Sequence, residues 1–252
     1  MIRPFLIALQ FLTRLPVRLT GELSATDLGR SLLYYPLVGL LLGGLLSAGA
    51  WLLASEGPIL AAALLLGLWV SLTGALHLDG LADMIDAWAG GRGDRARTLA
   101  LMKDPCSGPQ GVTGLVLVLL LKFSAMAELL KAAPFEAGTC LPLLLAPLMG
   151  RTALPLLFLT TPYVRPGGLG AALASGLSSG PAKAVLFTVG LLVLLGGGTA
   201  GAVGLVGTLI CFITLRRTMI NRIGGTTGDT AGALIEIIET VTLVAIVLAA
   251  GS

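Results

Sequence analysis

Charged residues are scarce in this sequence: 16 of its 252 residues are Lys or Arg and 13 are Asp or Glu, which is 12%. Soluble domains usually carry about 25% charged residues, so this composition cannot cover a water-soluble surface. The hydrophobic share of 56% and the mean hydropathy of +0.96 also exclude a disordered polar chain. We therefore predict a polytopic membrane protein.

Aromatic residues and cysteines are also few. With 5% aromatic residues and a net charge of +3, the chain has too little stacking surface and basic charge for a nucleic-acid-binding protein. Its cysteines, Cys106, Cys140 and Cys211, include no Cys-x-x-Cys pair and predict neither a disulfide framework nor a zinc site. The apolar stretch 4–13 contains Gln10 and is followed by no small-residue cleavage site. We expect a short interfacial helix there, not a signal peptide or a span.

Long, mostly apolar stretches predict the membrane spans, because a spanning helix needs about 20 such residues. The stretch 184–215 would be about 48 Å long as one helix, which exceeds a hydrocarbon core of about 30 Å. We therefore expect Gly196-Gly197-Gly198 to break it into a hairpin. The prediction is a single all-α membrane domain over residues 1–252, with seven spans at about 32–54, 58–76, 110–130, 139–161, 182–196, 199–215 and 231–250.

Loop charges predict the orientation of these spans. If the N-terminus lies inside, 13 of the 16 Lys and Arg residues fall on inner segments and only Lys131 falls outside. This positive-inside bias predicts a protein with its N-terminus and its polar segments 77–109 and 216–230 at the cytoplasmic face.

The acidic residues gather in the segment HLDGLADMIDAW. Asp79, Asp83 and Asp86 follow a spacing of i, i+4 and i+7, which places them on one face of a helix. Three such carboxylates near a bilayer favour a bound cation, and oxygen ligands suit Mg²⁺, Mn²⁺ or Ca²⁺ better than Zn²⁺. The alternative is a solvated helix that is merely acidic. Lys103 and Asp104 follow in a glycine-rich polar stretch on the same predicted face.

A second polar segment runs from Arg216 to Glu239. Gly224 and Gly225 free the backbone, and the N–H groups of such a turn, beside Arg222, can cradle a phosphate. Asp229 can cap the last span. The alternative is a plain connector between two spans. Together with the acidic segment, this arrangement indicates metal-dependent transfer of a phosphate ester at the cytoplasmic face.

Two cations and one histidine stand apart from these segments. Lys122 and Arg151 lie inside predicted spans, where a charge is expensive unless it meets a partner or a cavity. Each could contact an anionic substrate; otherwise Lys122 could reach the interface and Arg151 could pair with Glu128. His77 could serve the site or could simply lie at the membrane interface.

The motifs taken together resemble one family. FLTRLPV (11–17), YYPLVGLLLG (34–43), HLDGLADMIDAWAGG (77–91), MKDPCSGPQG (102–111), GR (150–151) and NRIGGTTGDTAGA (221–233) are similar, in this order, to the bacterial cobalamin synthases, the adenosylcobinamide-GDP ribazoletransferases. The resemblance implies a Mg²⁺-dependent enzyme of the bacterial cytoplasmic membrane. Such an enzyme joins adenosylcobinamide-GDP to α-ribazole or its 5′-phosphate and releases GMP.

The resemblance also implies roles for individual residues. Asp79, Asp83, Asp86 and Asp104 would be the metal ligands, and Asp79, Asp83 and Lys103 would act in catalysis. The expected substrate-binding residues are His77, Lys122, Arg151, Asn221, Arg222, Gly224, Gly225 and Asp229.

Two other functions remain open at this point, as does assembly into a homo-oligomer. A CDP-alcohol phosphotransferase motif also begins with Asp-Gly, but its later Gly-x3-Asp-x3-Asp stretch is missing here. A cation transporter could use acidic residues within the membrane, but the acids concentrate at one face and no inverted repeat is visible.

Overall fold

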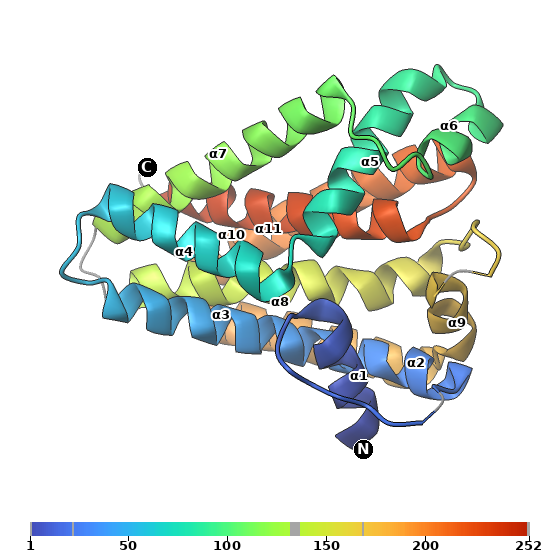
Figure 1. Cartoon of the computed structure of the whole chain (residues 1–252). Coiled ribbons are helices and arrows are strands. Elements are labelled where there is room, and N and C mark those ends of the chain that lie inside the picture. The colour runs from blue at the N-terminus through green and yellow to red at the C-terminus, as the bar shows by residue number, and fades with distance from the viewer. Residues whose placement is uncertain (1, 22, 132–136, 168, 251–252) are drawn as a thin grey trace.

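The computed structural model describes residues 2–21, 23–131, 137–167 and 169–250. It confirms the predicted all-α membrane bundle (Figure 1). The helices are α1 (Ile2–Leu12), α2 (Ala25–Ser31), the short 3-10 helix η1 (Leu32–Tyr34), α3 (Tyr35–Leu52), α4 (Pro58–Thr73), α5 (Leu76–Gly91), α6 (Arg95–Leu101), α7 (Pro109–Lys131), α8 (Ala137–Thr160), α9 (Leu169–Gly176), α10 (Ser179–Ile223) and α11 (Gly228–Ala250).

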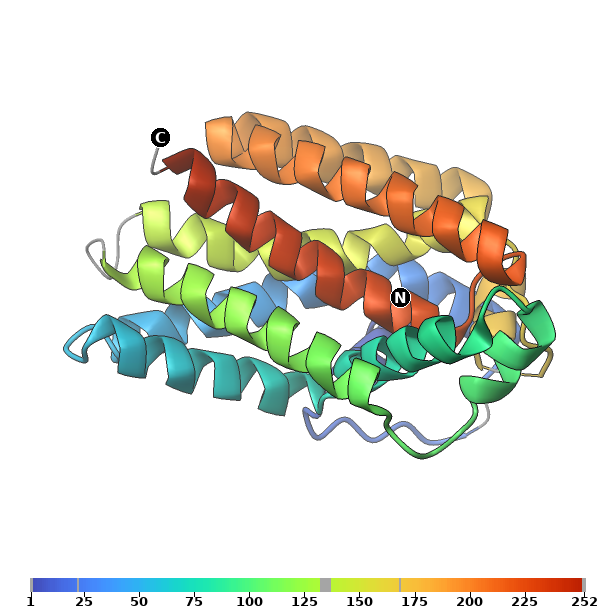
Figure 2. The ribbon, with the colours of Figure 1, turned by 90° about the horizontal axis from the view of Figure 1, so that it is seen from above.

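The long helices run side by side, with α8 and α11 in the middle of the bundle (Figure 2). Helix α8 packs along α3, α10 and α11, and α11 also packs on α5 and α7. Five helical stretches within the described residues are long and apolar enough to cross a membrane, and the bent pair of α4 and α5 raises the number to six. Their outer faces carry large exposed apolar side chains, as expected where lipid replaces water.

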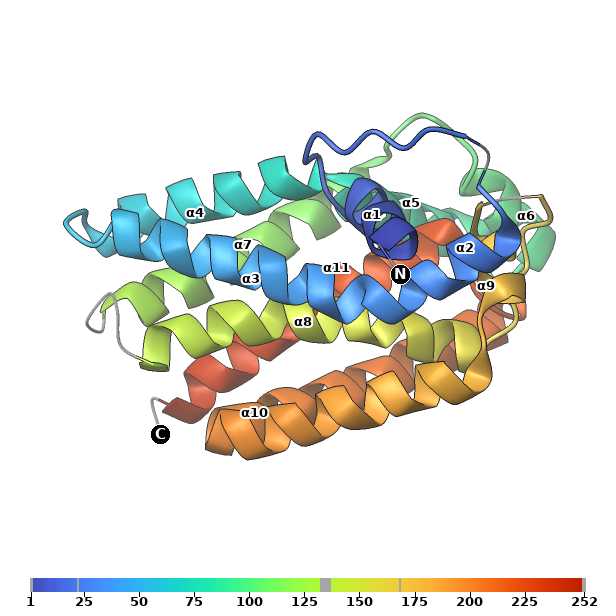
Figure 3. The same cartoon turned by 90° about the horizontal axis from the view of Figure 1, so that it is seen from below.

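Helix α10 is the hairpin predicted from its glycine triplet. Gly198 has φ 54° and ψ −137°, a conformation open to glycine and strained for other residues, and it divides α10 into two arms. The two arms lie against each other in Figure 3. The second arm continues to Ile223, beyond the predicted span end at 215, so most of the polar segment after it is helical and the loop is limited to 224–227.

The predicted span 58–76 ends earlier than expected. Helix α4 stops at Thr73, Gly74 and Ala75 both take left-handed conformations, and α5 leaves at 88° to α4. With 16 residues, α4 is about 24 Å long, short for a complete crossing. The bend matters for function, because it starts the acidic helix α5 inside the bundle beside α11.

The segments predicted to share one side of the membrane lie at one end of the bundle. Helices α2, α6 and α9 and the turn between α10 and α11 gather there, while the α3–α4 loop and the hairpin turn of α10 lie at the opposite end (Figures 1 and 3). Helix α1 packs on α2 and α3 and buries Ile7, Ala8 and Leu12. The sequence predicted a short helix here but missed α2 and α9, whose lengths of seven and eight residues give little periodic signal.

Candidate active site

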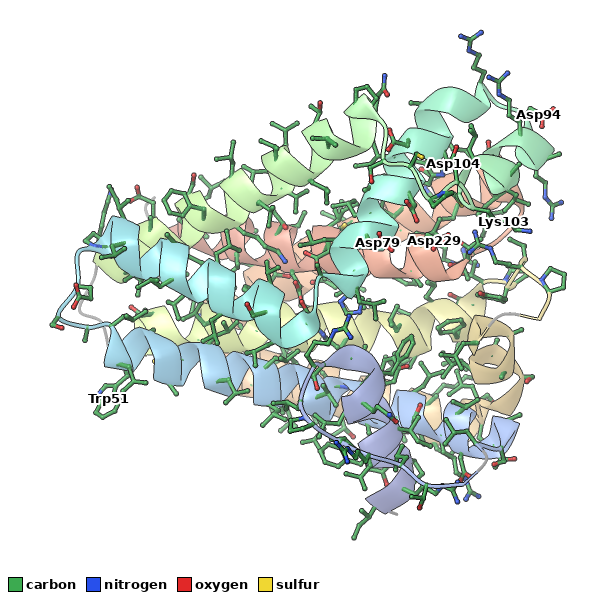
Figure 4. All side chains as sticks on the ribbon, viewed as in Figure 1. Trp51, Asp79, Asp94, Lys103, Asp104 and Asp229 are labelled. Atoms are coloured by element: carbon green, nitrogen blue, oxygen red, sulfur yellow. The ribbon has the colours of Figure 1, made fainter. Side chains whose placement is uncertain are left out.

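The site is organised where α5 crosses α11. At Gly80 the two backbones approach so closely that a Cβ atom would lie 2.8 Å from the carbonyl oxygen of Asp229, and only a residue without a side chain permits this contact. The crossing brings Asp79, in the first turn of α5, next to Asp229, in the first turn of α11 (Figure 4). Asp83 lies one turn further along α5.

The carboxylates at this crossing influence one another. The pKa of Asp83 is raised from 3.8 to about 6, first by burial and then by the carboxylates of Asp79, Asp229 and Asp86, against the opposing effect of Arg165. Like charges held this close favour a proton or another cation between them. The site therefore has the electrostatics expected of a cation-binding group.

Arg165 gives the site its nearest positive charge. Its Nη2 donates to Asp229 Oδ2 at 2.8 Å and to the carbonyl oxygen of Met102 at 3.5 Å. The guanidinium thus joins the segment after α8, the end of α6 and the start of α11. Sequence reasoning missed Arg165 as a site residue, and its only signal was a basic residue followed by proline and glycine between two spans.

Backbone contacts fix the turn between α10 and α11 against the segment after α8. Thr226 N–H donates to the carbonyl oxygen of Pro162 at 2.8 Å, and Val164 N–H donates to that of Thr226 at 2.9 Å. Gly225 fits this contact because a Cβ atom there would lie 2.1 Å from the carbonyl oxygen of Pro162. Gly224, at φ 77°, ends α10. The glycine turn is therefore docked and not a free connector.

An apolar cavity of about 280 Å³ opens beside the crossing. Asp79, Asp229 and Arg165 contribute its charged wall, and His77 also lines it. The remaining lining residues are Phe11, Tyr35, Leu76, Gly80, Leu154, Phe158, Tyr163, Leu169, Gly170, Leu173, Gly228, Ala231, Gly232 and Ile235. This combination of apolar walls and a few convergent polar groups is typical of a small-molecule site.

A second hollow of about 450 Å³ lies between α5, α6 and the loop before α7. Arg92 and Arg97 line it together with Asp104 and the backbone of Gly108. Both arginines are exposed and suited to bind phosphate oxygens. Lys103 and Asp104 lie in the loop after α6, at the same end as Asp79 and Asp229 (Figure 4).

The structure gives Asp86 a structural task. Its two carboxylate oxygens accept the N–H groups of Gly108 and Gly111 at 2.7 and 2.8 Å, where α7 begins. Because both oxygens are engaged, Asp86 is the least available of the four predicted metal ligands. Asp104 lines the second hollow, apart from the crossing, so the predicted set divides into two groups. Within the described residues, no three His, Cys, Asp or Glu side chains form a group that could hold a metal ion by themselves.

Lys122 and Arg151 belong to a buried ionic cluster. Lys122 Nζ lies 2.6 Å from a carboxylate oxygen of Glu236 and 2.6 Å from one of Glu239, and Arg151 pairs with Glu239. Lys122 also lies over the ring of Trp69, 4.4 Å from its centroid. The proposed pairing of Arg151 with Glu128 is wrong. Glu128 instead pairs with Lys131, three residues further along the exposed end of α7.

Lys122, by the same evidence, does not reach the interface, because its side chain is only 3% exposed. The four clustered groups carry two positive and two negative charges. Neither cation lines the cavity or the second hollow. This arrangement favours a structural role for both.

The remaining predicted residues lie around the site. Arg222, near the end of α10, donates to the carbonyl oxygen of Trp88 at 2.9 Å and lies over its ring, so it braces the end of α5. Asn221 is exposed beside it. His77 is 3% exposed and so is not an interface residue. Tyr163, which no sequence pattern marked, contributes an aromatic wall of the cavity.

The fold and site together define a multi-pass membrane enzyme with its polar site at one end of an apolar bundle. Residues 4–247 match the family model described as Cobalamin-5-phosphate synthase. The chain is 57% identical over 249 residues to the adenosylcobinamide-GDP ribazoletransferase of Pseudomonas aeruginosa PAO1, covering 98% of each chain. It is 56% identical over 248 residues to that of Stutzerimonas stutzeri A1501, covering 98% of this chain and 99% of the relative.

A third relative of the same name, from Pseudomonas putida GB-1, is 58% identical over 236 residues, or 94% of this chain and 95% of the relative. No solved structure matches the chain. The chain belongs to the Cobalamin-5-phosphate synthase family, as the sequence motifs indicated.

Proposed function

We propose that this protein transfers the adenosylcobinamide phosphate group from adenosylcobinamide-GDP to α-ribazole or α-ribazole 5′-phosphate, in the cytoplasmic membrane of a bacterium. The observation that carries the proposal is the convergence of Asp79, Asp83, Asp229 and Arg165 beside an apolar cavity in a chain of this family. The family favours this reaction over a CDP-alcohol phosphotransferase and a cation transporter.

The reaction exchanges a phosphoanhydride link for a phosphoester link. A hydroxyl oxygen of the ribazole ribose forms a bond to the phosphorus carried by cobinamide, and the bond from that phosphorus to the bridging oxygen breaks. The bridging oxygen and its electron pair leave with GMP. The hydroxyl proton passes to one of the carboxylates at the crossing.

Mg²⁺ fits the residues at the crossing. Asp79 and Asp83 would hold it, since carboxylates that repel one another are stabilised by a cation between them. Mg²⁺ is commonly bound by one or two carboxylates together with substrate phosphates, so these two side chains would suffice with the substrate present. When bound, it would supply neutralisation of phosphate charge.

Basic side chains would hold the rest of the nucleotide. Arg92 and Arg97, in the second hollow, would bind the phosphate that leaves with GMP, with Lys103 in the adjacent loop. We place this whole end of the bundle at the cytoplasmic face, because most Lys and Arg residues outside the spans belong to segments that gather there.

GMP release tests the proposal directly. Membrane vesicles containing the protein, supplied with adenosylcobinamide-GDP, should release GMP at a rate that rises severalfold when α-ribazole and Mg²⁺ are added together. Vesicles without the protein are the control. Release that ignores α-ribazole would contradict the proposed acceptor, and full activity in excess chelator would contradict the metal.

A further inference from the structure

The apolar cavity has walls suited to a flat aromatic ring. Phe11 and Tyr35 form one aromatic pair, with centroids 6.4 Å apart and planes 25° apart, and Phe158 and Tyr163 form another, 6.2 Å apart. All four line the cavity, and aliphatic side chains from α8, α9 and α11 complete its walls. Aromatic surfaces of this kind bind planar rings by offset stacking and edge contacts.

His77 and Tyr35 both line the cavity wall, are enclosed, and carry polar atoms without a hydrogen-bond partner within the described part of the chain, and His77 is the one next to the charged wall in sequence. His77 is 3% exposed, and neither ring nitrogen has a hydrogen-bond partner among the residues that the structure describes. Buried polar atoms are normally paired, because an unpaired one has lost its hydrogen bonds to water without replacement. An imidazole left unpaired in the wall of a cavity therefore points to a partner on the ligand.

We propose that this cavity binds the benzimidazole base of the ribazole substrate, with His77 donating a hydrogen bond to the ring nitrogen that carries no ribose. The base would lie between the aromatic walls, and the attached ribose would extend toward Asp79 and Asp229 at the charged wall. The assignment rests on the proposed function and specifies which substrate occupies which hollow.

The other candidate groups fit this cavity less well. Guanine carries more donors and acceptors on its edges than His77, Tyr35 and Tyr163 offer away from the charged side. A corrin ring with its amide side chains is far larger than 280 Å³ allows. A benzimidazole has a single free ring nitrogen, which one imidazole N–H can satisfy. The arginine-lined second hollow is then left for the GMP portion of the other substrate.

Replacing one substrate atom tests the hydrogen bond. The indole α-riboside has CH in place of the free nitrogen and is otherwise the same size. The protein in vesicles should use α-ribazole about tenfold better than this analogue in kcat/KM, because the analogue leaves His77 unpaired. In His77→Phe the two acceptors should be used equally, within about twofold.

A cavity-wall variant tests the same assignment without altering His77. Leu154 and Leu157 are both buried on α8, 4% and 0% exposed, but only Leu154 lines the cavity. Leu154→Ala should raise KM for α-ribazole about tenfold and leave KM for adenosylcobinamide-GDP unchanged, whereas Leu157→Ala should change neither.

Each outcome separates this inference from the proposed function. Equal use of ribazole and the indole analogue by the unaltered protein, or a preference that persists in His77→Phe, would overturn the role of His77. A raised KM for adenosylcobinamide-GDP in Leu154→Ala would assign the cavity to that substrate. An unchanged KM for both substrates would indicate that neither occupies the cavity and that lipid fills it. Both results would overturn the inference. Absence of ribazole-dependent GMP release from the unaltered protein would instead contradict the proposed function itself.

Discussion

Glu239→Gln should destabilise the protein strongly. Glu239 is completely buried and is shared by Lys122 and Arg151. Removing its charge leaves two cations facing only Glu236, and Arg151 cannot relieve the imbalance by losing its proton. Breaking one partner of a buried ion pair typically costs about 3–5 kcal/mol, and an uncompensated Arg within a membrane costs roughly 2.5–3.5 kcal/mol on insertion scales. We expect a loss of about 3 kcal/mol in the free energy of unfolding.

Equilibrium unfolding in mixed micelles with increasing SDS, followed by helicity, measures this loss. Glu128→Gln is the matched control: it removes the same charge from a pair with Lys131 in which both side chains are more than half exposed, at 54% and 58%. Such pairs contribute about 0–1 kcal/mol. A double variant, Glu239→Gln with Arg151→Met, restores neutrality and should recover most of the loss.

Equal stabilities of Glu239→Gln and Glu128→Gln would contradict the role given to the buried charges, as would a double variant no more stable than Glu239→Gln alone. The folded fraction of each variant should keep its KM for both substrates. A raised KM for adenosylcobinamide-GDP in Arg151→Leu would instead restore the interpretation of Arg151 as a substrate contact.

Three further predictions concern the site. Because the folded protein raises the pKa of Asp83 from 3.8 to about 6, ionised Asp83 opposes folding. Without divalent cations, the free energy of unfolding should therefore fall as the pH rises from about 4 to 6, and this fall should be absent in Asp83→Asn. The same pH profile in Asp83→Asn and the unaltered protein would contradict the shift. Asp86→Asn should lower the free energy of unfolding by roughly 2 kcal/mol, because an amide has one acceptor oxygen for the N–H groups of Gly108 and Gly111. An unchanged unfolding midpoint would contradict this. Gly225→Ala should lower the free energy of unfolding by roughly 1–3 kcal/mol, because the new methyl group would contact the carbonyl oxygen of Pro162. Gly228→Ala should leave it unchanged, because the space around Gly228 is open. Equal stabilities of the two variants would contradict the docking of the turn against the segment after α8.

The sequence was sufficient for the elements with strong local signals. Mostly apolar stretches of about 20 residues predicted the long apolar helices, and the glycine triplet at 196–198 predicted the hairpin. The i, i+4, i+7 spacing predicted that α5 presents acids on one face, and the structure adds that Asp86 turns its oxygens to the start of α7. Helix ends were less predictable. The left-handed pair Gly74-Ala75, where α4 ends, lies inside an apolar stretch that has no proline or polar cap to mark a boundary.

Partners far apart in sequence could not be predicted in the same way. Arg151 and Glu239 are 88 positions apart, and nothing local distinguishes Glu239 from Glu128 as the partner. Arg165 reaches Asp229 only because the segment after α8 pairs with the turn before α11. Such contacts follow from how helices pack, which single-sequence periodicity does not specify.

Ribazole-dependent GMP release by two matched variants tests the central claim that the carboxylates at the α5–α11 crossing carry out the transfer. Asp83→Asn removes a charge at the crossing. Asp94→Asn removes one from the exposed cap of α6, where an Asn oxygen can still accept the N–H of Arg97. With both proteins inserted and folded in vesicles, we predict that Asp83→Asn loses at least a hundredfold in kcat, whereas Asp94→Asn stays within about twofold of the unaltered protein. Normal release by Asp83→Asn would contradict the account.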